Sequence, residues 1–261
     1  MKGSPPLEQH SQKTALVTGS GKRLGLAIAE DLARHGFAVA IHANGSMAEA
    51  RQAADRLCGE GLTARAFQAN LRDSADAERL IQDVGAALGP ISLLVNNASV
   101  FLADEASSFD SATYDAHFDL HVKAPLVLGA AFVRQLPPGQ HGLIVNIIDQ
   151  RVLALTPRFF TYTLSKSALW TATKTMAQAF APQVRVNAIG PGPTVRSERQ
   201  QESDFQAQID RLPLERGPQL GEFGRTIRFL FDTPSITGQM VALDGGQHLT
   251  WKFPGDEEIV E

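Results

Sequence analysis

Short runs of β-branched and aliphatic residues alternate with longer segments of helical pattern along almost the whole chain. We predict seven strands, at residues 15–18, 37–41, 62–67, 91–95, 143–148, 184–189 and 239–243. We predict helices at residues 24–35, 46–58, 74–89, 113–136, 162–180 and 220–231. Buried strands that alternate with helices are typical of parallel sheets covered on both faces. The sequence therefore predicts an α/β fold with a doubly wound sheet of about seven parallel strands and helices on both faces.

The length and the even spacing of these elements indicate one domain. A chain of 261 residues suits a single α/β domain, and no linker divides it. We place the domain at residues 13–251, between a flexible N-terminus at 1–12 and an acidic C-terminal tail at 252–261. A polar segment at residues 194–218 interrupts the alternation, and its charges alternate in sign. This segment fits a solvated helix face, a mobile substrate loop, or both.

The composition excludes several classes of function. The 24 Lys and Arg residues against 28 Asp and Glu give a net charge of −4, which argues against a nucleic-acid partner. The single cysteine, Cys58, excludes an intramolecular disulfide and a multi-cysteine metal site. Residues 1–12 lack the apolar core of a secretory signal, and no apolar run is long enough to span a membrane. We therefore expect a soluble, cytoplasmic protein that acts on a small molecule.

A glycine-rich turn joins the first predicted strand to the first predicted helix. It reads Thr18-Gly19-Ser20-Gly21-Lys22-Arg23-Leu24-Gly25. Glycines at a helix N-terminus allow backbone N–H groups to approach a pyrophosphate, whose negative charge suits the helix dipole. We therefore expect a dinucleotide to bind along this turn. Its predicted contacts are Gly19, Gly21, Lys22, Arg23, Leu24 and Gly25.

The end of the second strand indicates which dinucleotide binds. Residues 42–46 contain no Asp or Glu, which would bind the ribose 2′-hydroxyl of NAD. Lys22, Arg23, Asn44 and Ser46 instead supply hydrogen-bond donors and positive charge. An acidic residue would repel a 2′-phosphate. Its absence therefore favours the phosphorylated cofactor, NADPH/NADP, over NADH.

The ends of the later strands add further predicted contacts to the cofactor. After the third strand come Asn70, which we expect to hydrogen-bond adenine, and Leu71. The fourth strand is closed by Asn97, Ala98 and Ser99, on the nicotinamide side. The sixth strand is followed by Pro191 and Gly192.

Tyr162 and Lys166 are the predicted chemical pair. They are four residues apart in a predicted helix and therefore lie on one face of it. A phenol titrates near pH 10, so it needs help to act as an acid or base at neutral pH. A neighbouring ammonium gives that help by stabilising the phenolate, as does the positive nicotinamide ring of an oxidised cofactor. The same Lys166 can hold the nicotinamide ribose.

Five motifs together resemble the short-chain dehydrogenase/reductase family over almost the whole chain. They are TGxxxRxG at 18–25, NNAS at 96–99, YTLSK at 162–166, GPG at 190–192, and ITGQ at 236–239 with DGG at 244–246. The resemblance implies a Rossmann-type fold and hydride transfer from a nicotinamide. It also implies that Tyr162 donates the proton with Lys166 as its electrostatic helper. A homotetramer built through the long helices near 113–136 and 162–180 is a further implication.

Two positions depart from the family's usual pattern. Asp149 stands at the position of the usual active-site Ser, thirteen residues before the Tyr, and His121 stands at the usual Asn. A carboxylate is a poor partner for an oxyanion that grows on a ketone, because like charges repel in a site of low dielectric constant. It suits a heterocycle whose ring nitrogen must be protonated. The sequence therefore points away from simple ketones. His121 fits either a packed helix residue or a proton relay.

Within the family, the chain resembles the pteridine reductases and the related dihydromonapterin and dihydrofolate reductases. The matching residues are Arg23, Ser99, Phe101, Asp149, Tyr162 and Lys166. The resemblance implies that Phe101 stacks on a flat pterin ring, and that Arg23 and Ser99 contact cofactor phosphate and substrate. Gly45 departs from this pattern, because many members carry an Arg there for the 2′-phosphate.

Two alternatives stay open beside a pterin reductase. The chain could reduce another carbonyl or an imine, or it could sense the cofactor with little catalysis. Intact Tyr162 and Lys166 argue against a sensor, which has no need for that pair. His117 and His121 have the spacing of a helical zinc pair. No third ligand is signalled near them, so we expect no metal.

Overall fold

The computed structural model describes residues 13–196 and 201–250, and the predicted flexible N-terminus and acidic tail lie outside these residues. One sheet of seven parallel strands runs through the molecule in the order β3-β2-β1-β4-β5-β6-β7. The strands are β1 Lys13–Val17, β2 Phe37–Ala43, β3 Ala64–Gln68, β4 Ile91–Asn96, β5 Gly142–Ile147, β6 Val184–Pro191 and β7 Met240–Leu243. The predicted doubly wound, Rossmann-type fold is confirmed.

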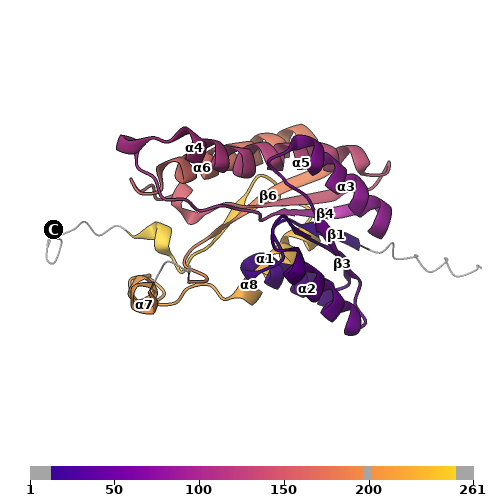
Figure 1. The fold of residues 1–261 in the computed structure, drawn as a ribbon, viewed down its shortest axis with the longest axis horizontal. Coiled ribbons are helices and arrows are strands. Elements are labelled where there is room, and N and C mark those ends of the chain that lie inside the picture. Colours follow the sequence, from indigo (N-terminus) through magenta and orange to yellow (C-terminus); the bar gives the residue numbers. More distant parts are fainter. Residues whose placement is uncertain (1–12, 197–200, 251–261) are drawn as a thin grey trace, which may run out of the picture.

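Helices cover both faces of the sheet (Figure 1). One layer consists of α1 Arg23–Arg34, α2 Met47–Gly59 and α8 Leu220–Asp232. The other consists of α3 Ser74–Leu88, α4 Ser111–Phe118, α5 Ala124–Gln135 and α6 Phe160–Phe180. Short 3-10 turns occur at Ala106–Ser108, Gln150–Val152 and Gln247–Leu249. Among the described helices, none is long and apolar enough to cross a membrane. The cytoplasmic location stays a prediction.

Two large hydrophobic clusters, one on each face of the sheet, form most of the core, and a third, small cluster contains Ile148, Leu169 and Ala188. Successive residues of a strand point to opposite faces, so Leu16 of β1 packs in one cluster and Val17 in the other. Both are fully buried, as are the neighbouring residues of β4. The central strands are therefore apolar on both faces, which explains why their sequence signal is a continuous apolar run.

The long helix predicted at 113–136 is interrupted, and this part of the prediction is wrong. The helix begins at Ser111, because Asp110 accepts a hydrogen bond from the N–H of Thr113 (2.8 Å). A π-helical turn at Asp119–Lys123 then separates α4 from α5. Pro125 explains the interruption, since it cannot donate to the carbonyl four residues earlier and its ring crowds that carbonyl.

The polar segment 194–218 contains a helix, α7 Glu202–Asp210, which stands apart from both layers of helices (Figure 1). The described part of this segment thus includes the solvated helix face that the charge pattern indicated, and none of the residues of α7 is buried. Residues 197–200, also in the predicted substrate loop, lie outside the described part of the chain. The remaining predicted boundaries differ from the observed ones by a few residues.

Candidate active site

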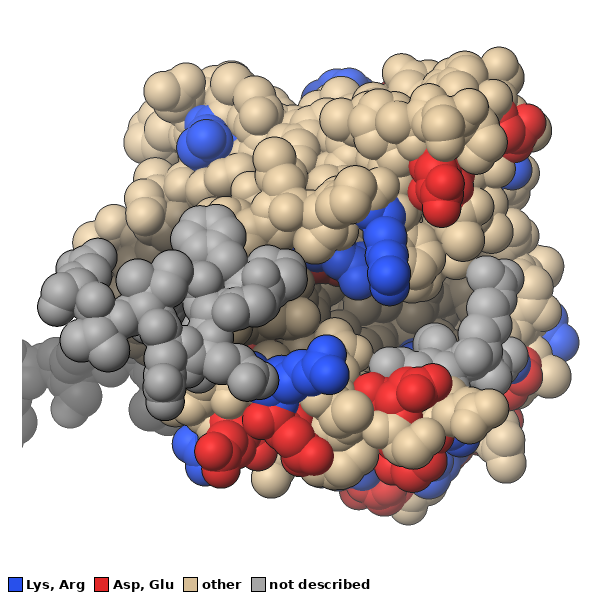
Figure 2. All heavy atoms as spheres, turned by 90° about the vertical axis from the view of Figure 1, so that its left-hand side faces the viewer, with Lys and Arg blue, Asp and Glu red and all other residues tan. Residues whose placement is uncertain are grey.

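A cleft opens at the carboxyl ends of the strands, where the strand order reverses between β1 and β4. Ligands of open α/β sheets bind at this position. One cavity there has a volume of about 690 Å³, and Figure 2 shows the hollow with basic side chains on both rims. A second cavity of about 490 Å³ adjoins it. Both are lined by Arg23, Ser99, Asp149 and Tyr162, so two ligands could meet at these residues.

The glycine-rich turn forms one wall of the first cavity and is fixed by hydrogen bonds to the end of β4. Asn97 Nδ2 donates to the carbonyls of Thr18 (2.9 Å) and Gly19 (3.1 Å). Thr18 Oγ1 accepts from the N–H groups of Asn97 (2.9 Å) and Ala98 (3.0 Å). Gly19 has a φ of +62°, and a Cβ on it would lie 2.8 Å from the Cα of Ala98. Both conformation and space therefore require glycine here.

Gly25→Ala is expected to lower the free energy of unfolding by about 1–3 kcal/mol and to impair dinucleotide binding. A Cβ there would lie 2.5 Å from Asn97 Nδ2 and from the carbonyl oxygen of Gly19, so the turn would have to shift. Gly85→Ala in α3 is the control, because nothing lies within 4 Å of its Cβ. Denaturant unfolding and NADPH fluorescence titration measure the two effects. Equal stability and equal NADPH affinity in the two variants would contradict the need for glycine at position 25.

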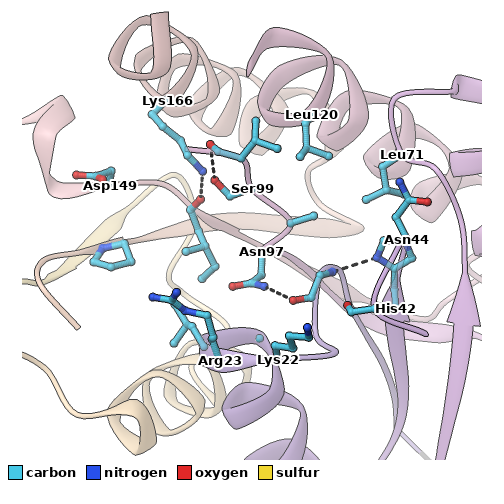
Figure 3. Close-up of a pocket in the computed structure, with 18 of the residues that line it drawn as sticks. Lys22, Arg23, His42, Asn44, Leu71, Asn97, Ser99, Leu120, Asp149 and Lys166 are labelled. Carbon is cyan, nitrogen blue, oxygen red and sulfur yellow. Dashed lines mark hydrogen bonds between the residues drawn. The ribbon is translucent and has the colours of Figure 1, made fainter. Parts of the chain in front are cut away.

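His42 supports the same turn, and the sequence analysis missed it. Its Nδ1 accepts from the N–H of Gly19 (3.0 Å), so its Nε2 carries the hydrogen and donates to the carbonyl of Ala69 (3.1 Å). Figure 3 shows the bond to Gly19 at the edge of the cavity. Burial lowers the pKa of His42 from 6.5 to about 4, although the bond to Ala69 opposes this shift. The side chain is thus a neutral acceptor for the turn.

The free energy of unfolding is expected to fall as the pH drops from about 6.5 towards about 4. In this interval the unfolded chain binds a proton at His42 and the folded chain does not, so acid favours unfolding. Above the pKa of His42 in the unfolded chain, the full stabilisation from this pKa difference is present. It amounts to roughly 3 kcal/mol, at 1.36 kcal/mol per pKa unit. Denaturant unfolding of the parent and of His42→Asn, across this pH range, measures it. The exposed His35→Asn is the control, and an unchanged slope in His42→Asn would refute the prediction.

Most of the residues predicted to bind the dinucleotide lie together around the first cavity. They are Gly19, Lys22, Arg23, Leu24, Gly25, Asn44, Ser46, Asn70, Leu71, Asn97, Ala98, Ser99, Tyr162, Lys166, Pro191 and Gly192. Gly21 is the exception, because it packs against Ser46 instead of lining the cavity. Lys22 forms an ion pair with Glu49 (2.6 Å), an acidic neighbour that the sequence analysis did not consider. Figure 3 shows Asn44 and Leu71 at one end of this cavity and Asp149 and Lys166 at the other.

Arg23 ties the glycine-rich turn to the predicted substrate loop. Its φ of +53° lies in the left-handed region that favours glycine and is unusual for a residue with a side chain. Its Nη2 donates to the carbonyls of Val195 (3.1 Å) and Arg196 (3.0 Å). The side chain lines both cavities, as expected of a residue between cofactor and substrate.

Tyr162 and Asp149 meet where the two cavities join. The Tyr162 hydroxyl donates to Asp149 Oδ2 (3.0 Å), and Asp149 Oδ1 accepts from the N–H of Arg151 (2.8 Å). Burial, and then the Asp149 carboxylate, raise the pKa of Tyr162 well above 10. The pairing of Tyr162 with Lys166 predicted stabilisation of the phenolate, whereas these contacts stabilise the phenol. Tyr162 is therefore a protonated donor at neutral pH.

Lys166 lies beside Tyr162 on α6, as its spacing predicted. Its Nζ donates to the carbonyl of Ile147 (2.9 Å) and lies 5.7 Å from the centre of the Tyr162 ring. Burial lowers the pKa of Lys166 from 10.5 to about 8, although Asp149 opposes this shift. The ammonium is thus held at the inner end of the site and remains largely charged at neutral pH.

The second cavity contains the predicted substrate contacts, including Phe101. The Phe101 ring stacks on Phe159 with a centroid distance of 4.2 Å and meets the Tyr162 ring edge-on at 4.8 Å. The Arg151 guanidinium lies over Phe101 (5.4 Å) and Phe159 (5.0 Å). Sequence reasoning missed Phe159 and Arg151. Only the position of Arg151, two residues after Asp149, signalled it.

The comparisons with known proteins assign the family. The family model described as "short chain dehydrogenase" matches residues 13–207. The chain belongs to this family and is an oxidoreductase of it, as its motifs predicted. A curated relative, the 3-oxoacyl-[acyl-carrier-protein] reductase FabG of Staphylococcus aureus, is 27% identical over 91% of this chain and 98% of its own length.

Two solved structures are much more similar to this chain. Both are described as FolM Alternative dihydrofolate reductase 1 in complex with NADP. The protein from Brucella canis is 52% identical, with a TM-score of 0.92. The protein from Brucella suis is 53% identical, with a TM-score of 0.91. Each comparison covers 94% of this chain and 98% of the other. The resemblance to dihydrofolate and pteridine reductases within the family is therefore confirmed.

Proposed function

We propose that this protein is an NADPH-dependent reductase of a pterin-like ring. The observation that carries the proposal is the bond from Tyr162 to Asp149 at the junction of the two cavities. A carboxylate there favours a substrate with ring and amino N–H groups to offer, rather than a ketone that develops an oxyanion. The similarity to the two NADP-bound FolM structures supports both the cofactor and the class of substrate.

The residues of the first cavity fit the cofactor. The glycine-rich turn and the N-terminus of α1 offer backbone N–H groups to a pyrophosphate. Asn44 and Ser46 line this cavity and would offer donors to a 2′-phosphate, and Asn70, also in its lining, would hold the adenine. At the inner end, the buried Lys166 ammonium suits the ribose hydroxyls of the nicotinamide. When bound, NADPH supplies the hydride.

The chain's own residues supply the proton and orient the ring. Tyr162 carries a proton at neutral pH and donates it in a hydrogen bond to Asp149. With a substrate nitrogen in place of Asp149 as the acceptor, it would release that proton to the ring. Asp149 accepts hydrogen bonds from the substrate and, together with Arg151, holds the polar edge of the ring. Phe101 offers its partly exposed face for stacking on a flat heterocycle.

We also propose that the protein is a homotetramer. The resemblance to the family implies interfaces on the long helices. The support in this structure is that these helices carry exposed apolar side chains. Leu126 of α5 and Leu164 of α6 are each 42% exposed. Contact with a second copy would bury them. Light scattering coupled to gel filtration measures the assembly.

The test of the proposed function is the loss of NADPH absorbance with dihydrobiopterin, biopterin and dihydrofolate, beside a panel of ketones and imines. We expect turnover of the pterin compounds. Turnover of ketones or imines alone would instead support a reductase of another substrate. Binding of NADPH with no turnover of any compound would support a cofactor-sensing protein.

A further inference from the structure

Two histidines hold the backbone of the segment that follows β4. The N–H of Val100 donates to Nε2 of His121 (3.1 Å), and the N–H of Leu102 donates to Nε2 of His117 (3.2 Å). Phe101 lies between these two anchored residues. The hydroxyl of Ser99 lies 2.9 Å from the same nitrogen of His121. Ser99 thus contacts an imidazole directly, and the backbone on each side of Phe101 is held by one.

These contacts determine the tautomer of each imidazole. A backbone N–H can only donate, so each Nε2 is an unprotonated acceptor and the ring hydrogen is on Nδ1. Nδ1 of His117 then donates to Thr161 Oγ1 (2.8 Å), and Nδ1 of His121 donates to Ser165 Oγ (2.9 Å). Thr161 and Ser165 belong to α6, the helix of Tyr162. Each neutral ring therefore joins the segment after β4 to the catalytic helix.

The two hydroxyl groups of α6 that accept from the imidazoles donate their own hydrogens to further acceptors. Ser165 donates to the carbonyl of Tyr162 (2.7 Å), and the Thr161 hydroxyl donates to the Asp104 carboxylate. Asp104 also accepts from the N–H of Thr161, so the segment after β4 caps the start of α6. Each hydroxyl thus accepts from an imidazole and donates onward, in agreement with a hydrogen on Nδ1 of each ring.

The surroundings keep both imidazoles neutral. His117 and His121 are buried, and their rings stack with a centroid distance of 5.5 Å. Burial lowers the pKa of both, and the Lys166 ammonium lowers both further, while Asp104 opposes the shift at His117. The Tyr162 ring packs edge-on against both imidazoles, at 5.8 Å and 5.4 Å. The π-helical turn, a feature frequent at functional sites, contains His121.

We infer that His117 and His121 are positioning residues, neutral imidazoles that fix Ser99 and Phe101 relative to Tyr162 through α6. The consequence for substrate binding rests on the proposed function. Nε2 of His121 accepts from the backbone N–H of Val100, which has no proton to release, so we assign this residue the role of a brace and not of a proton relay. If the segment after β4 were not held in place, the Phe101 ring would be displaced. Substrate binding would then weaken before proton donation by Tyr162 was affected.

Two substitutions of His121 separate its two bonds. Glutamine places an amide oxygen near the position of Nε2 and can still accept from Val100. Asparagine reaches only the position of Nδ1 and can still donate to Ser165. We expect His121→Gln to keep the pterin KM within about threefold and His121→Asn to raise it about tenfold or more. In both variants the pH profile of kcat should stay unchanged.

A relay role would give a different result. Both variants would then lose kcat equally and shift its pH profile, and that result would overturn the inference. Equal KM values in the two variants would overturn it as well. His35→Gln, on the exposed end of α1, controls for the loss of an imidazole elsewhere.

The tautomers can be measured without a substrate. Long-range ¹H–¹⁵N correlation spectra of the full chain should show both rings as neutral Nδ1–H imidazoles from about pH 6.5 to about pH 8.5. A ring that titrates in this range, or that carries its hydrogen on Nε2, would overturn the inference. Correct tautomers without pterin turnover would refute only the proposed function. Pterin turnover with wrong tautomers would refute only the brace.

Discussion

Replacing Tyr162 with phenylalanine is expected to lower kcat on pterin substrates by about 10²- to 10⁴-fold, the usual contribution of a positioned acid. The substitution removes the hydroxyl that donates to Asp149 and leaves the ring contacts with Phe101 intact. The pKa of this phenol is raised, so the parent enzyme holds the proton at neutral pH. NADPH oxidation measures kcat, and fluorescence titration should show an NADPH Kd close to that of the parent.

The chain offers a matched control, because it has two tyrosines. The other, Tyr114, lies on α4 and packs against Phe118 with a centroid distance of 4.2 Å. Tyr114→Phe should turn over pterins at the parental rate. If Tyr162→Phe retained more than about a tenth of the parental kcat, another group would have to be the acid. Loss of NADPH binding in the same variant would indicate damage to the site rather than to proton transfer.

The fold could be predicted because its signals are local. Continuous apolar runs such as 143–148 mark strands buried on both faces, and a glycine-rich turn after the first of them marks the dinucleotide site. The parallel topology follows from the alternation with helices. The positions of Asp149, Tyr162 and Lys166 followed in the same way, since fixed spacings along strands and helices determine where side chains emerge.

The interruption of the long helix was also signalled in the sequence. Pro125 stands within the predicted range 113–136, and a proline inside a helical pattern ends or distorts the helix. Its consequence, the π-helical turn that contains His121, depends on packing against α6 and the segment after β4. The proline predicts a distortion there, but the contacts made by His121 come from elements distant in the sequence.

Other parts of the site depend on neighbours that only folding brings together. His42 reads as one more residue of a strand, and its role comes from contacts with Gly19 and Ala69 on two other segments. Arg151 and Phe159 meet Phe101 only because the segment after β4 lies beside the start of α6. The direction of the pKa shift of Tyr162 was missed for the same reason. The spacing pointed to Lys166, whereas the hydrogen bond goes to Asp149.

Asp149 is expected to determine which substrate the site reduces. Asp149→Asn keeps the side chain's shape but removes its charge, so we expect kcat/KM on pterins to fall by about 10²-fold or more. Asp149→Ser restores the residue usual in the family at this position. It should lose pterin turnover to a similar degree and gain turnover of ketones, because a hydroxyl can donate to a developing oxyanion and a carboxylate cannot.

The charge of Asp149 can also be detected at Tyr162 itself. The carboxylate raises the pKa of the phenol, so in Asp149→Asn the phenolate should form at a lower pH than in the parent. Tyrosinate absorbance measures this shift cleanly in a Tyr114→Phe background, where Tyr162 is the remaining tyrosine. The exposed Asp83→Asn, on α3, is the control for the loss of one negative charge. An unchanged phenol titration together with unchanged pterin turnover in Asp149→Asn would remove the carboxylate from the mechanism. The family's usual serine would then be as good a residue at this position, and the choice of substrate would have to come from Phe101 and Arg151.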